Sequence, residues 1–425
     1  MSRDKNDTPS PALTYVSVEQ ALEHILLGLT PLAPERVPLD EAAGRVLAGE
    51  VTAPADLPPF PNSAMDGFAV RSIDTAGASQ ETPATLAIIG EVRAGQLPAI
   101  SLSPGCAIRI MTGAPIPDGC DAVVQVERVR QQSEQVLVYQ SVTPRQNIRP
   151  AGGDIRQGQV LFEVGHALRP TEIGILAAIG CAQVDVTRRP RVAILATGDE
   201  LVEIDQSPAP GQIRNSNEAA VTALVRHYGG MPVPLGIARD TQKSLEAKIQ
   251  LALEQSVDLF VTSAGVSVGD YDLVKDVLAS QGNMVFWKVN MKPGKPLAFG
   301  EVRGIPWLGL PGNPVSCVVS CEIFVRPAIL KMSGHRYWQK PVVTARVDEA
   351  VTNSGRRHYM RGQVRREADG YHVSIRASDE TVQGSSLLSS LIWANGLVVI
   401  PETVDFLPVG SQVQVHMLDW PESVF

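Results

Sequence analysis

Residues Asp258–Asp272, DLFVTSAGVSVGDYD, decide the fold that this sequence predicts. Their first part, Leu259–Ser263, is a short apolar run bounded by turn residues, as in a strand buried on both faces of a parallel sheet. A loop of small residues follows, and an amphipathic segment with helical spacing, 271–280, comes next. A strand, a small-residue loop and a helix in this order present backbone N–H groups to phosphate. The loop residues expected to bind phosphate are Ser263, Gly265, Ser267 and Gly269.

The same loop carries two acids, Asp270 and Asp272. Acids beside a phosphate site predict a metal ion, because bare anions would repel each other. The alternative is an ordinary tight turn between a strand and a helix, with both acids solvated. The pattern recurs elsewhere in the chain, and this recurrence favours a binding site.

Two further buried-strand runs end in polar residues. Arg191–Thr197, RVAILAT, is followed by Gly-Asp-Glu, which places Glu200 just after a strand. Ile305–Leu310, IPWLGL, is followed by Pro-Gly-Asn-Pro, with an Asn suited to cap a long apolar helix over 315–330 and a Pro suited to its first turn. Ligands of open parallel sheets bind outside the carboxyl ends of the strands. We therefore expect a site at this edge that includes Pro311, Asn313, Pro314 and Ser316.

Composition limits the class of protein. The chain has 425 residues, of which 44% are hydrophobic and 19% charged, as in a soluble globular protein. The net charge of −8 argues against nucleic acid as the main partner. No apolar run reaches membrane-spanning length, and the polar N-terminus has no apolar region like that of a signal peptide, so we expect a cytoplasmic protein. None of the five cysteines forms a C-x-x-C pair, which favours buried packing over zinc or redox roles.

Changes of pattern along the chain divide it into four predicted domains. A capping box at Ser17 begins a helix, a second short helix is predicted over 40–48, and a third is capped by Thr171. Short alternating runs with frequent Gly and Pro predict β structure both before Thr171 and near the C-terminus. The expected domains are a helical and linker domain I (14–52 and 150–183), an inserted β-rich domain II (53–149), a doubly wound α/β domain III (184–335) and a small barrel-like β domain IV (336–425).

Three other positions are candidates for chemistry. Asp66 lies in NSAMDG after a proline-rich loop, and Thr112 lies in MTGAP at the end of a strand. Alone, either motif is better explained by turn chemistry. Asp240 follows a strand end, and the alternative role for it is to cap the helix that starts at Thr241.

Three lysines occur within eight residues of WKVNMKPGKPLAF, although the chain as a whole is acidic. The alternative is a solvated surface run. The neighbouring prolines and glycine predict a rigid loop, which favours a site for phosphate or a metal oxyanion. The lysines are Lys288, Lys292 and Lys295.

Seven motifs in a fixed order carry a resemblance. They are NSAMDG, MTGAP, GQIRNSN, ATGDEL, GVSVGDYD, KPGKP and LPGNPVS. Together they resemble the molybdopterin molybdenumtransferase family, also called the MoeA family, and the E domain of gephyrin. The resemblance runs from about Leu13 to the C-terminus, and the order and spacing of the motifs make it specific although each one alone is weak.

This resemblance implies a reaction in which adenylylated molybdopterin and molybdate give molybdenum cofactor and AMP, with Mg²⁺ as cofactor. It also implies an elongated homodimer with sites shared between subunits, and the preceding adenylyltransferase as a possible partner. The family's functional positions fall on Asp66, Thr112, Glu200, Asp240 and Asp272, of which the last three are the expected metal ligands. The basic loop and the LPGNP prolines match the three lysines, Pro311 and Pro314.

The sequence differs from the family pattern at two places, and two alternative functions stay open. Family members often have two glycines where this chain has Ala264-Gly265, and Glu-Asp where it has Gly153-Asp154. Arg149, expected to bind substrate, is retained. One rival is the adenylyltransferase that acts earlier with ATP, because its fold resembles the doubly wound domain. The other is a non-catalytic scaffold of the gephyrin type.

Overall fold

A six-stranded sheet forms the centre of the chain in the computed structural model, which describes residues 16–264, 281–376 and 383–420. Its strand order is β16-β13-β17-β21-β20-β18. The first four strands are mutually parallel, and β20 and β18 extend the sheet antiparallel. The predicted bounds of three strands are confirmed. The strands are β16 (Met231–Ala238), β13 (Arg191–Thr197), β17 (Leu259–Ser263), β21 (Ile305–Leu310), β20 (Pro296–Val302) and β18 (Gly282–Lys288).

The sheet is buried on both faces, which explains why its parallel strands are almost continuously apolar. In β13, Val192 and Ile194 pack into one hydrophobic core, while Ala193 and Leu195 pack into the other. Helix α4 (Gln242–Glu254) covers the second core, and the first is covered by α1 (Val18–Leu27), α3 (Ser216–His227) and the helical segment after β21. The predicted doubly wound arrangement is therefore confirmed.

The predicted long helix after β21 has three parts. Helix α6 (Pro314–Ser320) continues into a π-helical turn, η4 (Cys321–Val325), and then into α7 (Arg326–Met332). Pro327 has no N–H to donate to the preceding turn, which accounts for the change of hydrogen-bond pattern at this place. Asn313 occupies the predicted cap position, but it makes no side-chain cap bond there.

Two predictions for the segments around the sheet differ from the structure. The capping box at Ser17 is present. The helix predicted over 40–48 is wrong: only η1 (Leu39–Glu41) is helical, Gly44 has a φ of +74°, and Leu47 bridges to Val186. A left-handed glycine ends a helix, and the bridge draws the following residues into extended backbone. In α2 (Pro170–Ala178) the N-cap is Arg169 rather than Thr171.

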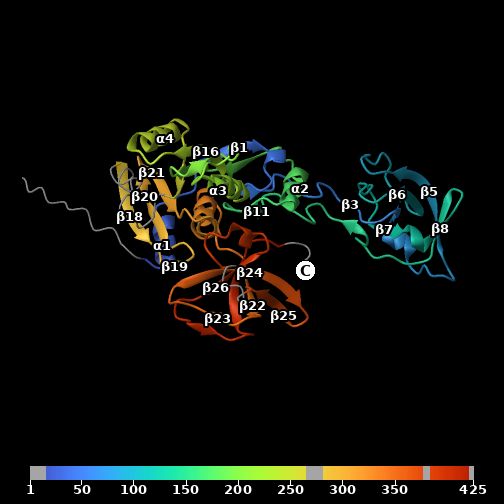
Figure 1. The fold of residues 1–425 in the computed structure, drawn as a ribbon. Coiled ribbons are helices and arrows are strands. Elements are labelled where there is room, and N and C mark those ends of the chain that lie inside the picture. The colour runs from blue at the N-terminus through green and yellow to red at the C-terminus, as the bar shows by residue number, and fades with distance from the viewer. Residues whose placement is uncertain (1–15, 265–280, 377–382, 421–425) are drawn as a thin grey trace, which may run out of the picture.

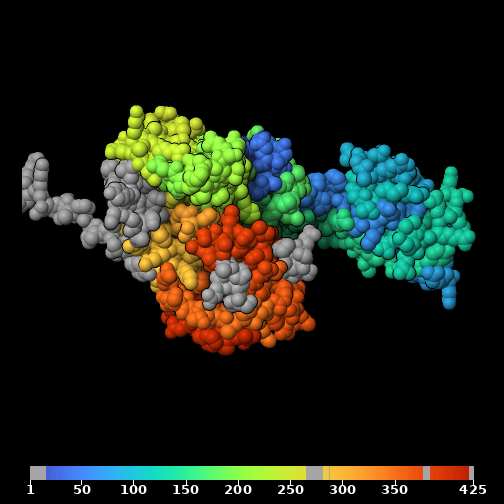
Figure 2. Space-filling view, in the orientation of Figure 1, coloured from blue at the N-terminus to red at the C-terminus, as the bar shows by residue number. Residues whose placement is uncertain are grey.

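Short strand pairs connect the sheet to a second β-rich unit. The pairs are β1 (Pro34–Pro38) with β12 (Gln183–Thr187), β2 (Val51–Thr52) with β11 (Val160–Phe162), and β3 (Asn62–Ser63) with β10 (Ile148–Arg149). Beyond β3, the chain forms a sheet of order β7-β4-β6-β5-β9-β8, which stands apart from the rest as a separate lobe behind a narrow neck (Figures 1 and 2). Its strands are β4 (Gly67–Val70), β5 (Ala84–Val92), β6 (Cys106–Ile110), β7 (Ala122–Gln125), β8 (Val129–Gln132) and β9 (Gln135–Val138), with η2 (Ser72–Thr75) and η3 (Val126–Arg128) between them.

The C-terminal strands close into a small barrel, because β24 pairs with both β25 and β26. Strand β24 (Arg357–Glu367) is the longest strand among the described residues, and it was not predicted from the sequence. The barrel reaches the central sheet through β19 (Met291–Lys292), which pairs with β24. Its other strands are β22 (Val342–Val347), β25 (Gly370–Ser374), β26 (Gly396–Ile400) and β28 (Gln412–Met417), with a separate pair β23 (Val351–Thr352) and β27 (Phe406–Leu407).

The fold class expected from the sequence is confirmed. The exact domain boundaries stay a prediction. Among the described residues, no helix is long and apolar enough to cross a membrane.

Candidate functional site

A pocket of about 520 Å³ opens where β13, β17 and β21 end, at the carboxyl edge of the sheet. Its size lies within the usual range for small-molecule sites. Six residues expected from the sequence line it: Glu200, Ser263, Pro311, Asn313, Pro314 and Ser316. The carboxyl ends of parallel strands meet at one edge, so loops separated by more than 100 residues in sequence share this pocket.

The loops after β17 and β21 contact each other across the pocket. Ala264 N–H donates to the carbonyl oxygen of Leu310 at 3.1 Å, and Ala264 has a φ of +70°. This left-handed backbone costs a non-glycine residue about 1–2 kcal/mol. A Cβ added at Gly312 would lie 3.1 Å from the Ala264 methyl group, so a glycine at 312 provides the space that the methyl at 264 occupies.

The start of α3 supplies two side-chain amide groups to the pocket. They belong to the GQIRNSN motif, but the sequence alone gave them no role. Asn215 is 3% exposed, its Oδ1 accepts from Glu218 N–H at 3.2 Å, and its Nδ2 donates to Glu218 Oε2 at 2.7 Å. Asn217 Nδ2 donates to the carbonyl oxygen of Gly312 at 2.8 Å. The cap therefore fixes α3 against the loop after β21, and Arg214, Asn215 and Asn217 all line the pocket.

Domain IV completes one wall of the pocket with Ser386. The neighbouring Ser385 accepts two hydrogen bonds, at its Oγ from Asn313 Nδ2 (3.1 Å) and at its carbonyl from Val315 N–H (3.2 Å). Arg361, fully buried in β24, donates from Nη2 to the carbonyl of Gly384 at 3.0 Å. No local pattern pointed to Ser386, because the barrel brings it to the pocket from 70 residues beyond Ser316.

Acidic side chains crowd the end of β13. Gly198 has a φ of +145°, and a Cβ there would lie 2.4 Å from Glu200 Oε2, so only glycine allows this carboxylate to fold back. Burial raises the pKa of Asp240, and the charges of Asp199 and Glu200 raise it further. Asp240 is not a helix cap, because the N-cap of α4 is Thr241.

This set of donors fits a divalent cation, since hard oxygen ligands are what Mg²⁺ prefers and a cation would relieve the repulsion among the acids. Glu200 lines the pocket and Asp240 lies close enough to feel its charge. Asp272, the third expected ligand, lies outside the described residues, as do Gly265, Ser267 and Gly269.

The basic segment lies between the sheet and the barrel. Lys288 ends β18, Lys292 lies in β19, and Lys295 directly precedes Pro296, which lines the pocket. Burial, with the charges of Lys292, Arg361 and Arg356, lowers the pKa of His358 to about 3. His358 is 3% exposed, and among the described residues neither ring nitrogen has a hydrogen-bond partner.

A buried histidine among cations marks a positive field on the segment that joins the central sheet to the barrel. Such a field suits an anion, because an anion would offset charges that the fold leaves close together.

Asp66 and Thr112 form a compact pair in the separate β-rich lobe. Thr112 donates to Asp66 Oδ1 from its backbone N–H (2.7 Å) and from Oγ1 (2.8 Å), and the backbone bond is the larger cause of the lowered pKa of Asp66. Arg149 pairs with Asn62 where β10 meets β3, at the root of this lobe. The lobe that carries Asp66 and Thr112 stands apart from the central sheet, beyond the neck (Figure 1), whereas the pocket lies where β13, β17 and β21 end.

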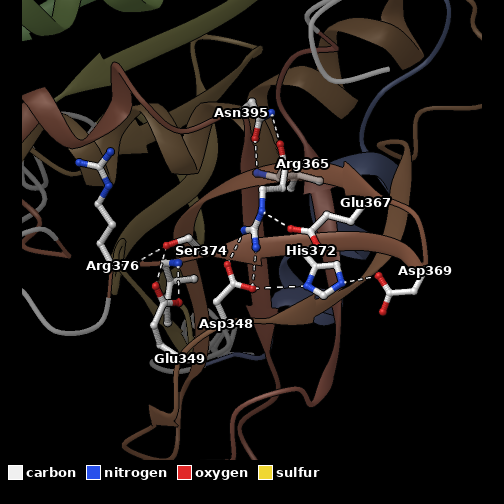
Figure 3. Close-up of polar contacts among 11 residues, drawn as sticks. Asp348, Glu349, Arg365, Glu367, Asp369, His372, Ser374, Arg376 and Asn395 are labelled. Carbon is white, nitrogen blue, oxygen red and sulfur yellow. Dashed lines mark hydrogen bonds and ion pairs between the residues drawn. The ribbon is translucent and has the colours of Figure 1, made fainter.

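A second polar cluster lies in the barrel, between β24 and β25 (Figure 3). Among the described residues, Glu367, Asp369 and His372 are the only group of three or more His, Cys, Asp or Glu residues whose potential metal-ligand atoms all lie within 4.8 Å of one another. Arg365 donates to Glu367 Oε1 at 2.7 Å and pairs with Asp348, while His372 Nε2 lies 2.9 Å from Asp369 Oδ1. Arg365 pairs with Glu367 and Arg346 pairs with Asp369, so both carboxylates already have cationic partners and we assign this cluster to barrel stability.

Comparisons with known proteins agree with the geometry. Residues 16–180 match the MoeA N-terminal region (domain I and II), 193–331 a probable molybdopterin binding domain, and 344–418 the MoeA C-terminal region (domain IV). The chain is 38% identical to the molybdopterin molybdenumtransferase of Nostoc sp. (97% of this chain, 96% of the relative). It is 36% identical to that of Haemophilus influenzae (94% and 98%). A solved structure of the molybdopterin biosynthesis moeA protein from Pyrococcus horikoshii matches with a TM-score of 0.81 and 30% identity, over 95% of this chain and 100% of that one.

The structure is thus a multidomain chain with a pocket at the carboxyl edge of the parallel strands of its central sheet. The chain belongs to the molybdopterin molybdenumtransferase family, as its sequence motifs predicted, and it is a transferase of molybdenum cofactor biosynthesis.

Proposed function

We propose that this chain inserts molybdate into adenylylated molybdopterin and releases AMP, with Mg²⁺ as the metal. The observation that carries the proposal is the pocket in which two strand-end loops, the amide-rich start of α3 and Ser386 converge. Family membership supplies the class of substrate, since the relatives are named for the transfer of molybdenum to molybdopterin.

The phosphates of the substrate bind the loops over 263–269 and 311–316. Ser263 and Ser316 supply hydroxyl groups there, and Asn313 supplies an amide. Arg214, also in the lining, provides a guanidinium fork that matches phosphate oxygens. Several donors in one pocket hold the phosphoanhydride in one orientation, which lowers the entropic part of the barrier.

The metal is held by acids drawn from Glu200, Asp240 and Asp272. When bound, it polarises the phosphoanhydride of the substrate. Glu200 faces the pocket, and Asp240 supports it with further negative charge.

Molybdate binds on the basic side, where the field of Lys292, Arg356 and Arg361 surrounds His358. Lys288 and Lys295 add positive charge on the same segment. Fixed cations of this kind stabilise oxyanion charge without reorganising during the reaction. Two thiols of the substrate replace two molybdate oxygens, which leave as water with the thiol protons and the protons that anhydride hydrolysis releases. A water molecule cleaves the anhydride to release AMP, so the protein needs no nucleophile.

The complete site is shared between two subunits. Asp66 and Thr112 lie in the lobe beyond the neck and Arg149 lies at its root, so we expect them to complete the pocket of another copy of the chain rather than their own. A two-fold dimer makes this exchange reciprocal, with two equivalent sites. The adenylyltransferase that makes the substrate would be its natural neighbour.

The test is AMP release from adenylylated molybdopterin, measured with and without molybdate. We expect AMP to appear at a rate that rises with molybdate, with no consumption of ATP. ATP consumption without molybdate would instead identify an adenylyltransferase. Binding of the substrate with no turnover under any condition would favour the scaffold.

A further inference from the structure

A second cavity, of about 530 Å³, lies at the opposite edge of the parallel sheet from the substrate pocket. It is bordered by β1 and η1 on one side and by the amino ends of β13 and β16 on the other; β1 lies beside β16 in Figure 1. The cavity therefore spans the junction between domain I and the sheet. Its lining residues are Glu35, Glu41, Arg45, Arg188, Arg189, Arg191 and Met231.

Two of its four arginines are fixed in place by the fold. The Arg45 side chain is only 8% exposed, donates from Nη2 to the carbonyl of Thr187 at 3.1 Å and pairs with Glu35. Arg188 forms a two-pronged pair with Asp258, at 2.6 and 2.8 Å. Arginines that are already held lose little conformational entropy when a ligand binds.

The other two arginines leave positive charge in the cavity. Among the described residues, neither Arg189 nor Arg191 has a carboxylate partner, and Arg191 donates from Nε to the carbonyl of Gln255 at 3.0 Å. With Asp258 included, four cations face three acids, so the cavity is positive in a chain whose net charge is −8. Glu41 is exposed and has no ion-pair partner among the described residues, which leaves its oxygens free to accept.

We propose that this cavity binds a small phosphomonoester that carries hydroxyl groups, of the size of a pentose phosphate. Arg189 and Arg191 take the phosphate, since guanidinium groups match phosphate oxygens two at a time. Glu41 accepts from a sugar hydroxyl, because an ionised carboxylate only accepts hydrogen bonds. The ligand would lie across the junction of domain I with β13 and β16, at a site separate from the proposed substrate pocket.

The test uses ribose 5-phosphate, inorganic phosphate and ribose as probes in calorimetric titrations of the full-length protein. We expect ribose 5-phosphate to bind more tightly than inorganic phosphate, and ribose alone to give no binding heat. Arg189→Ala and Arg191→Gln should each weaken the binding of ribose 5-phosphate by about tenfold, because each substitution removes one of the two guanidinium groups that bind the phosphate. Glu41→Gln should weaken ribose 5-phosphate but leave inorganic phosphate unchanged.

Two controls separate this site from others. Arg130→Ala removes an exposed arginine in β8 of the separate lobe and should leave binding unchanged. Glu200→Gln alters the substrate pocket and should also leave it unchanged. Equal loss in Arg130→Ala or Glu200→Gln, or no binding of ribose 5-phosphate by the unmodified protein, would overturn the proposal.

Discussion

The substrate pocket and the Asp66–Thr112 pair are assembled in opposite ways. The pocket gathers Glu200, Ser263 and Asn313 from one chain, because parallel strands bring their carboxyl ends to one edge. The Asp66–Thr112 pair is carried away from that edge by an insertion, and it is locally complete, with both hydrogen bonds inside its own lobe. The residues that match the family's functional positions thus lie in two places, the pocket at the sheet edge and the separate lobe. We propose that a second copy of the chain brings the two together.

The largest expected effect comes from substituting a residue of the substrate pocket and a residue of the Asp66–Thr112 pair in separate chains. Asp66→Ala and Glu200→Ala should each lower AMP release by about 100-fold or more as homodimers, as loss of a positioned catalytic group does. In a mixed dimer, one site receives both defects and the other receives none. Random mixing puts half of the chains in mixed dimers, so about a quarter of the unmodified activity should return on co-expression.

Asp118→Ala is the matched control for the lobe, because this exposed acid has no assigned role there. It should remain active alone and in every mixture. Verified mixed dimers of Asp66→Ala with Glu200→Ala that stay inactive would show that the two halves do not meet across subunits.

A smaller effect tests the pocket half alone. Glu200→Gln keeps the shape of the side chain and removes its charge, so the Mg²⁺ concentration for half-maximal AMP release should rise by about tenfold. The measurement is a Mg²⁺ titration at saturating substrate. Glu203→Gln, in the exposed loop after β14 (Leu201–Val202), is the control and should show the unmodified requirement. The same Mg²⁺ requirement in both variants would remove Glu200 from the set of metal ligands.

The smallest effect tests the lobe half. Hydrogen bonds from Thr112 hold the pKa of Asp66 below its ordinary value, so the carboxylate stays charged until the pH falls through that lowered pKa. Thr112→Val removes the Oγ1 bond and keeps the backbone bond, which raises the pKa of Asp66. The acid limb of the pH profile for AMP release should therefore move to higher pH.

Thr112→Ser retains the hydroxyl and should keep the unmodified profile. If Thr112→Val lowers activity equally at every pH, Thr112 acts on the substrate or the fold rather than through the charge of Asp66.

Much of the fold could be predicted because its signals are local. The bounds of β13, β17 and β21 follow from apolar runs that end at turn residues, and such runs form the same strands in the structure. The helix predicted over 40–48 was wrong for the opposite reason, because the bridge of Leu47 to Val186 joins residues far apart in the sequence and leaves no sign in the local pattern. Strand β24 was missed because charged residues interrupt its apolar pattern, although barrel closure buries even Arg361 within it.

By itself, the sequence determined the strand-end loops, their polar residues and the family. Each of these depends on short stretches that can be interpreted without knowing which other segments pack against them. Only the tertiary structure decided that Asn215, Asn217 and Ser386 share a pocket with Glu200, since that depends on how α3 and the barrel dock on the sheet edge. It also decided that Arg45, Arg188, Arg189 and Arg191 line one cavity at the other edge. Long-range packing brings these groups together, and packing is a property of the whole chain rather than of any segment.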